Sequence, residues 1–168
     1  DASAVSSLTV RGCVLVDNAT GANVCSRSSH FADVVVQRGG YGIRYDDACY
    51  SSPVLEPYSL QLTGVTVQDA SQTGIDITSS SPRGKWIELF TDIEASSCGQ
   101  HGISIVLNEP NDLSISNSTL SNNTGDGLKV VFGSGLGRTD VTSVDLRTNG
   151  NGAHGVEIIA IEQIERRG

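Results

Sequence analysis

The sequence lacks several features that would point to particular classes of protein. It has no methionine, few aromatic residues (5%) and no basic excess, because 19 acidic side chains stand against 11 basic ones and give a net charge of −8. Nucleic acids and anionic membranes are bound through basic patches, so this balance argues against both partners. No apolar run approaches the roughly 20 residues of a membrane-spanning helix, so no direct membrane insertion is expected.

The chain also lacks a signal peptide at its start, so we expect a processed product or a segment of a longer protein. Its four cysteines form no C-x-x-C pair, which argues against a zinc ribbon or a thioredoxin-like motif. N-glycosylation sequons begin at Asn18, Asn117 and Asn122, which are the glycosylation candidates. Cysteines together with sequons favour a secreted or cell-surface protein.

Glycine is abundant, with 19 residues, and one short pattern organises much of it: glycine, apolar, any residue, apolar. The copies begin at Gly42, Gly74, Gly102, Gly127 and Gly155, at intervals of roughly 25 to 32 residues. Such a composition is typical of many short strands separated by tight turns. The glycine before each strand predicts a corner with positive φ.

A second pattern runs in step with the first and reads apolar, any, small or polar, apolar, any, apolar. Its copies begin at Val10, Phe31, Leu62, Phe90, Ile115 and Val141. The small or polar residue in the middle predicts a bend between two strands, and in chain order it is Gly12, Asp33, Gly64, Asp92, Asn117 and Ser143. Two patterns with one shared, drifting period indicate a solenoid.

The repeat predicts the fold. Side chains of a strand alternate between inside and outside, and coils stacked about 4.8 Å apart bury a continuous column of inner residues that one coil cannot bury alone. One expected core column is Ile43, Ile75, Ile103, Leu128 and Val156. We therefore expect an all-β chain, a single-stranded right-handed parallel β-helix of about six coils, in which residues 1–168 form a single domain.

These repeats resemble the right-handed parallel β-helix family with the pectate-lyase-like fold, which includes pectin-degrading enzymes, uronan epimerases and phage tailspikes. The Asn- and Gly-rich turns at 122–127 and 149–155 are also similar to those of extracellular junction and adhesion proteins of the bark beetle type. The resemblance implies the fold, and it leaves the function open because that fold hosts many functions. Insertions at 46–59, 78–84 and 133–138 follow the first-pattern strands, so their loops should gather on one side and mark the natural binding face.

A polysaccharide-cleaving enzyme of this family needs an acid and a base on adjacent coils. The segment around His101 resembles a polygalacturonase Gly-His-Gly-Ile-Ser motif, and Asp46 and Asp47 resemble its paired aspartates. The order of these fragments along the chain departs from the family, and the segment that ends at Asp76 lacks the Asn-Thr-Asp that should precede its glycine, Gly74. Enzymatic activity stays uncertain, with these residues as catalytic candidates if it exists.

The residues that point outward from the first-pattern strands form a column, in coil order Arg44, Asp76, Ser104, Lys129 and Glu157. Of these, Arg44, Lys129 and Glu157 are the ligand-binding candidates. Their charges alternate in sign one coil apart, which predicts a self-neutralising ladder, whereas a groove for acidic polysaccharides would need an excess of Arg and Lys. Aromatic candidates for sugar binding are Tyr45, Tyr50 and Trp86, with Tyr58 in the same group.

Another column consists of the residues before the repeat glycines. His101, Asp126 and His154 should lie on three successive coils, where they could serve as acid and base or hold an ion. The two histidines would be about 9.6 Å apart at strand spacing, which is wide for one ion, so a turn ladder held by hydrogen bonds is the favoured interpretation. We expect no bound metal and no cofactor.

The cysteines follow the same repeat. Cys25 and Cys49 both come after a first-pattern strand on adjacent coils and are the disulfide candidates. Cys13 falls on an inward position, and Cys98 lies in a turn too many coils away to pair with it. The expected function is a non-catalytic extracellular structural or adhesion module that contacts a protein or a polysaccharide and could stack on itself through its coil ends. The alternatives are a polysaccharide lyase, hydrolase or epimerase, or a glycan-binding module, each using the looped face.

Overall fold

The computed structural model describes residues 7–26, 28–46, 58–79, 86–108, 111–133 and 140–160, and all regular structure in them is β-strand. The strands, in chain order, are β1 Ser7–Arg11, β2 Val14–Val16, β3 Thr20–Val24, β4 Ser28–Gln37, β5 Tyr41–Asp46, β6 Tyr58–Gln68, β7 Ile75–Ser79, β8 Trp86–Thr91, β9 Glu94–Ser96, β10 Ile103–Leu107, β11 Asn111–Ser116, β12 Thr119–Ser121, β13 Leu128–Phe132, β14 Asp140–Val144, β15 Arg147–Asn149 and β16 Val156–Ala160.

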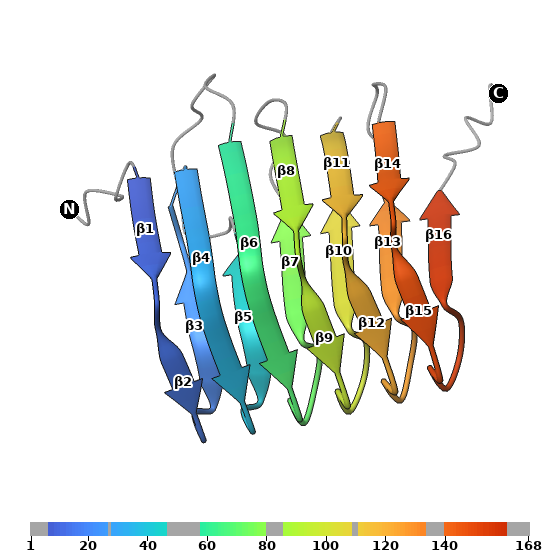
Figure 1. The fold of residues 1–168 in the computed structure, drawn as a ribbon. Helices are drawn as coiled ribbons and strands as arrows, with labels where there is room; N and C mark the ends of the chain where they lie inside the picture. The colour runs from blue at the N-terminus through green and yellow to red at the C-terminus, as the bar shows by residue number, and fades with distance from the viewer. Residues whose placement is uncertain are drawn as a thin grey trace, which may run out of the picture.

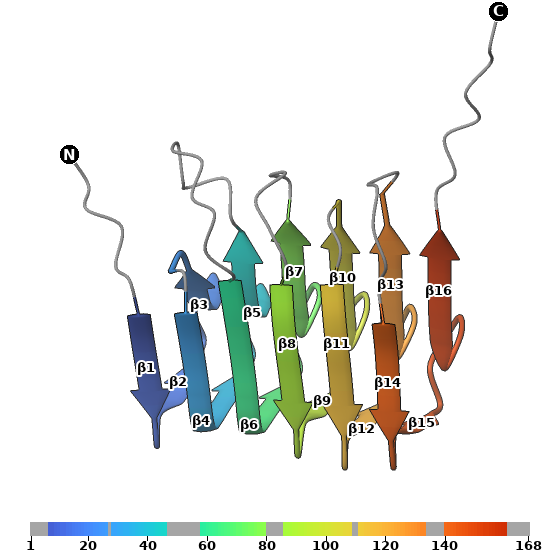
Figure 2. The ribbon, with the colours of Figure 1, turned by 90° about the horizontal axis from the view of Figure 1, so that it is seen from above.

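The strands form two sheets that face each other, and the chain passes from one to the other in every coil (Figure 1; Figure 2). The six-stranded sheet has the order β16-β13-β10-β7-β5-β3, and the remaining strands form the ten-stranded sheet. Neighbouring strands in both sheets come from consecutive coils and pair in parallel, as in β5 with β7 and β10 with β13. This arrangement confirms the predicted all-β parallel β-helix.

The expected core columns lie between the sheets. Ile43 pairs with Ile75, Ile75 with Ile103, and Ile103 with Leu128, and all four side chains are buried. On the ten-stranded sheet, the column that runs from Val10 through Phe31, Leu62 and Phe90 to Ile115 is also in register. The two apolar columns pack against each other and close the interior.

The last coil departs from the predicted register by two residues. Val141 pairs with Leu113, while Ser143 lies opposite Ile115, where the sequence pattern places Val141. Asp145 consequently occupies the bend that was expected at Ser143, with φ 51°. The error has a simple physical reason: a slip of two residues keeps every side chain on its original face, so the alternation of apolar residues does not reveal it.

The corners of the coils also differ in part from expectation. The predicted bend residues Gly12, Asp33, Gly64, Asp92 and Asn117 all adopt positive φ. The glycines that precede the strands of the six-stranded sheet do not have positive φ, so that prediction is wrong. Glycine is needed at these corners because a side chain would collide with the neighbouring coil. A Cβ atom on Gly74, for example, would lie 2.6 Å from the carbonyl oxygen of Gly102 on the next coil.

The buried interior extends over about four turns, fewer than the predicted six coils. Almost all of the buried apolar residues lie between Phe31 in β4 and Val130 in β13. In the first coil Val10 is only partly buried, and in the last coil Val156 and Ile158 are 44% and 53% exposed. In the described part of the chain, no helix is long and apolar enough to cross a membrane.

Candidate functional site

Three polar side chains stack at the corner where the chain enters the six-stranded sheet. His101, Asp126 and His154 each lie two residues before a strand of that sheet, β10, β13 and β16 respectively. These strands pair in parallel, so equivalent turn residues of successive coils come together. The structure therefore places the members of the predicted column next to one another.

Asp126 occupies the middle of this stack and contacts both histidines. Its Oδ1 is 2.9 Å from Nδ1 of His154, and its Oδ2 is 3.1 Å from Nδ1 of His101. The backbone N–H of His154 donates to the same Oδ1 at 3.0 Å, and the backbone N–H of Asp126 donates to Nδ1 of His101 at 3.0 Å. Asp126 thus ties three coils together, because its carboxylate accepts hydrogen bonds from His154 and its backbone N–H donates to His101.

The Asp126 side chain is only 3% exposed, yet it stays ionised. Burial acts to raise its pKa, but the hydrogen bonds from the His154 amide and ring, with His101 and Lys129 nearby, outweigh burial and hold the pKa below its usual value. The carboxylate is therefore a buried negative charge that donors from the next coil stabilise.

Lys129 and Glu157 extend the cluster along the outward face of β13 and β16. They pair in register, and Nζ of Lys129 is 2.9 Å from Oε2 of Glu157 and 4.0 Å from Oδ2 of Asp126. The hydrogen bond to Glu157 raises the pKa of Lys129. Oε1 of Glu157 also lies 3.7 Å from Nδ1 of His154, so the column before the glycines and the outward column form one network.

One subset of this network has the donor types and closeness of a metal site. Among the described residues, Asp126, His154 and Glu157 each offer one ligand atom, and the three atoms lie within 4.8 Å of one another. They are a different set from the two histidines that the sequence places too far apart for one ion. A nitrogen with two carboxylate oxygens is a donor set that divalent transition metals accept.

The other charged candidates lie further along the same sheet. Arg44 has its Nε 3.7 Å from Oδ2 of Asp76 on the next coil and its guanidinium 3.9 Å from Asp46, and it also packs over the ring of Tyr41 at 5.3 Å. Burial raises the pKa of Asp76 despite the neighbouring Arg44. These pairs follow the expected ladder of alternating charges.

The aromatic candidates do not present a described sugar-binding surface. Tyr45 is fully buried and donates its hydroxyl to the carbonyl oxygen of Ser26 at 2.6 Å, so its expected role on the surface is wrong. The repeat itself explains this position, because Tyr45 has the same parity as the inward Ile43. Tyr50 and Asp47, and the side chains of Tyr58 and Trp86, lie outside the described part of the structure.

The cysteines and sequons are placed as follows. Cys25 is in a disulfide, and its predicted partner Cys49 lies outside the described residues, so that pairing stays a prediction. Cys13 and Cys98 are free thiols; burial raises the pKa of the Cys98 thiol to about 11, which makes it a poor nucleophile at neutral pH. Asn18, Asn117 and Asn122 are all exposed, as glycosylation requires.

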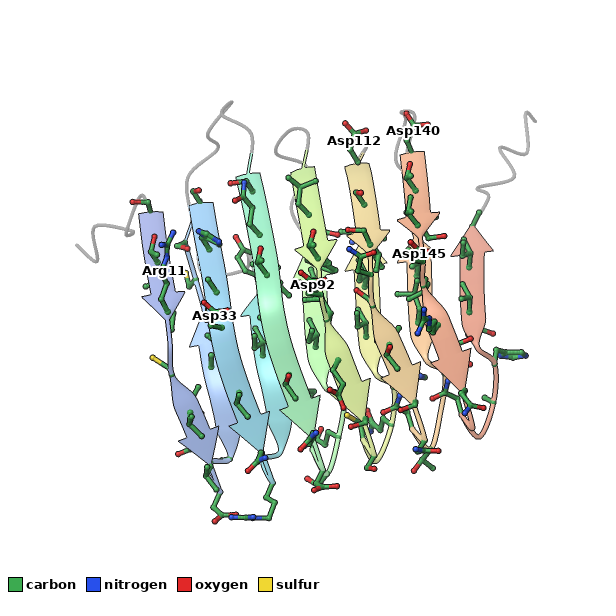
Figure 3. All side chains as sticks on the ribbon, viewed as in Figure 1. Arg11, Asp33, Asp92, Asp112, Asp140 and Asp145 are labelled. Atoms are coloured by element: carbon green, nitrogen blue, oxygen red, sulfur yellow. The ribbon has the colours of Figure 1, made fainter. Side chains whose placement is uncertain are left out.

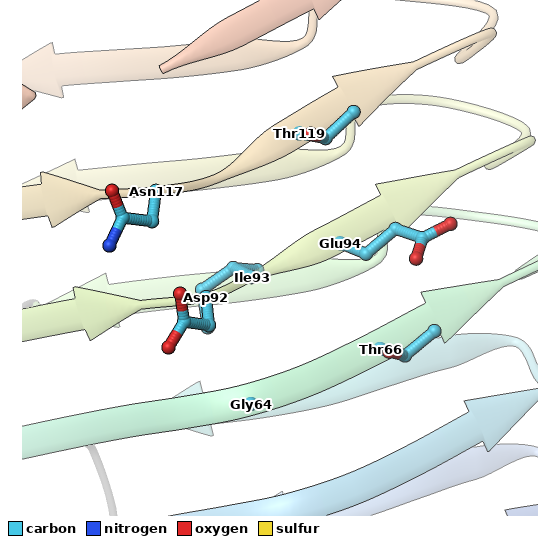
Figure 4. Close-up of a pocket in the computed structure, with 7 residues that line it drawn as sticks. All are labelled: Gly64, Thr66, Asp92, Ile93, Glu94, Asn117 and Thr119. Atoms are coloured by element: carbon cyan, nitrogen blue, oxygen red, sulfur yellow. The ribbon is translucent and has the colours of Figure 1, made fainter. Parts of the chain in front are cut away.

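A hollow on the opposite sheet was not predicted from the sequence. It follows the bend of the ten-stranded sheet, with a volume of about 450 Å³, and Figure 4 shows its polar lining. The lining residues are Gly64, Thr66, Asp92, Ile93, Glu94, Asn117 and Thr119. A smaller hollow of about 270 Å³ shares Asn117 and Thr119 and reaches Asp145 and Arg147. Aspartates recur along this bend, as Figure 3 shows for Asp33, Asp92 and Asp145. The sequence signal was the recurring polar residue at the bend, which was interpreted only as a turn.

Comparison of the chain with models of protein families, with curated proteins and with solved structures finds no match.

Proposed function

We propose that this chain is a non-catalytic structural or adhesion module of an extracellular protein. One observation carries the proposal: the charged side chains on the six-stranded sheet pair with one another from coil to coil. Asp126 contacts His101 and His154, Lys129 contacts Glu157, and Arg44 contacts Asp76. Side chains that are committed to tying coils together support a scaffold rather than a reactive groove.

An enzymatic role has weaker support. Glycoside hydrolysis needs one carboxyl group held protonated as an acid and a second carboxylate on the other side of the bond. Asp126 is buried with its pKa lowered, so it lacks a proton to donate, and its Oδ1 already accepts hydrogen bonds from the amide and the ring of His154. The Cys25 disulfide and the exposed sequons support an extracellular location.

Turnover assays test this proposal. The pure protein is incubated with pectic, alginate and neutral polysaccharides, and reducing ends, unsaturated products and epimerised residues are measured. We expect no turnover on any member of the panel. Turnover that is lost in both Asp76→Asn and His101→Ala, but kept in the remote Asp17→Asn, would overturn the proposal and establish the polysaccharide-active alternative.

A second candidate function is glycan binding without turnover, and the polar hollow of the ten-stranded sheet favours it. Threonine, asparagine, carboxylate and arginine side chains are the hydrogen-bonding groups that hydroxyl-rich ligands require. A glycan array checks this alternative, with Asn117→Ala and Arg147→Ala as variants in the hollow and Gln37→Ala as a control on the same sheet. Binding that only the hollow variants weaken would establish it.

A further inference from the structure

The network around Asp126 contains a position that is suited to a cation. His154 Nδ1 lies 2.9 Å from Asp126 Oδ1 and 3.7 Å from Glu157 Oε1. A tetrahedral zinc ion, with bonds of about 2.0–2.2 Å to nitrogen and oxygen, sets its ligand atoms about 3.4 Å apart. These two separations lie on either side of that value, and all three ligand atoms lie within 4.8 Å of one another, so side-chain rotations can bring them onto one ion.

The backbone already fixes the central ligand. Asp126 is held by the amide of His154 on Oδ1, and the parallel pairing of β13 with β16 brings Glu157 to the same end of the network. A ligand that is already held in place reduces the entropic cost of binding an ion. His154 is 62% exposed and Glu157 is 26% exposed, so the ion has a path from solvent and water can complete its coordination.

Lys129 shows that this position attracts positive charge. Its ammonium group lies between the two carboxylates, 2.9 Å from Glu157 and 4.0 Å from Asp126. An incoming ion has to share these carboxylates with Lys129, and removal of the ammonium group leaves them free for the ion. A metal site at this position therefore predicts that removing the Lys129 side-chain charge strengthens metal binding.

From this geometry we propose that Asp126, His154 and Glu157 bind one divalent transition-metal ion, of which Zn²⁺ is the best match to one imidazole and two carboxylates. The ion takes the place of the hydrogen that His154 Nδ1 shares with Asp126 Oδ1. It crosslinks the coil of β13 to the coil of β16, in which Val156 and Ile158 are largely exposed. The site is independent of the proposed scaffold role, because a scaffold can hold such an ion or lack it.

Titration of the untagged protein with Zn²⁺ tests the site. Calorimetry should give one ion per chain, and His154→Ala, Glu157→Gln and Asp126→Asn should each weaken binding at least tenfold. His30→Ala is the matched histidine control and should leave the affinity unchanged. Lys129→Gln should tighten binding at least threefold, whereas Arg38→Gln, which removes a remote paired cation, should have no effect.

Cobalt(II) identifies the ligand type independently. The Co²⁺ complex should show the ligand-field bands of nitrogen and oxygen ligands without a thiolate charge-transfer band, and Cys13→Ser should leave it unchanged. Circular dichroism checks that each variant is folded, and the gain of affinity in Lys129→Gln cannot come from unfolding. Absence of binding at millimolar Zn²⁺, binding that His154→Ala leaves intact, or binding that Lys129→Gln fails to tighten would each overturn the proposal.

Discussion

Glu88 is the most unusual residue of the core. Its side chain points inward from β8, in register between Leu60 and Leu113, and it is fully buried. Within the described residues, neither carboxylate oxygen has a hydrogen-bond partner. Burial raises the pKa of Glu88 to about 8, so the side chain is protonated in the folded protein at neutral pH.

This buried acid predicts a loss of stability as the pH rises. The pKa of Glu88 is raised from 4.5, its ordinary value, to about 8 in the folded protein. The stabilisation that comes from its protonated side chain is therefore complete below pH 4.5 and is lost as the pH rises from 4.5 through 8. The free energy of unfolding should fall by about 1.4 kcal/mol per pH unit in this window. Urea unfolding of the wild type and Glu88→Leu between pH 5 and 9 measures the difference.

The variant Glu88→Leu matches the leucines on either side, so it should be more stable at pH 8 and should lack this slope. The exposed Glu94 on the same coil provides the control, because Glu94→Gln should keep the slope of the wild type. Identical slopes in the wild type and Glu88→Leu would contradict the assignment.

Two glycines are favoured for different reasons: Gly74 because a side chain has no space there, and Gly12 because its φ is positive. Gly74→Ala places a Cβ atom 2.6 Å from a backbone oxygen and 3.0 Å from Cys98 Sγ, so we expect a loss of about 1–3 kcal/mol in unfolding free energy. Gly12 has φ 60° and nothing within 4 Å of its Cβ position. Gly12→Asn should change stability by less than about 0.5 kcal/mol, because Asn tolerates this conformation. Equal losses in thermal unfolding would refute the distinction.

Some residue positions followed from the sequence and others did not. Ile43, Ile75 and Ile103 could be aligned because their glycines mark each coil. The sequence pattern places Glu157 and His154 in separate columns, whereas their side chains lie 3.7 Å apart in the structure. A sequence pattern gives the face of a residue but not the direction of its side chain. Tyr45 and Glu88 had inward parity that could have been recognised, and their polar groups obscured it.

At the scale of the strand, the last coil shows a limit of sequence patterns. The repeat predicts the existence and pairing of β14, but it places the strand two residues away from its actual register against β11. The missing signal was the corner itself, because Asp145 rather than Ser143 has the positive φ shared by Asn117. A residue type that favours left-handed backbone was therefore a better marker of register than the apolar pattern.

Asparagines provide a second tie between coils. Asn123 is buried; its Oδ1 accepts the backbone N–H of Cys98 at 3.0 Å, and its Nδ2 donates to Asn151 Oδ1 at 3.0 Å. Asn123→Ala leaves buried groups unpaired, so we expect a loss of about 1–3 kcal/mol in unfolding free energy. The exposed Asn149→Ala serves as the control. Chemical denaturation that shows equal stability for both variants would contradict this role.

At the scale of the whole molecule, the buried interior lies in the middle turns and the last coil exposes apolar residues. Among the described residues, β3 and β16 are the edges of the six-stranded sheet, and Val156 and Ile158 lie on the exposed edge. Open edges of parallel sheets can pair with further strands, which fits the proposed role of a module in a larger assembly. The Asp126 network stabilises the coils next to this end.

The central claim is that the Asp126 network holds the coils together, and the stability of Asp126→Asn tests it most directly. Replacing an ionised carboxylate that accepts hydrogen bonds and contacts two histidines should lower the free energy of unfolding by about 1.5–3 kcal/mol. Residues that serve catalysis often reduce stability, and their replacement then stabilises the fold. A less stable Asp126→Asn protein is the predicted result, whereas unchanged or increased stability would contradict the account and favour a catalytic role for the network.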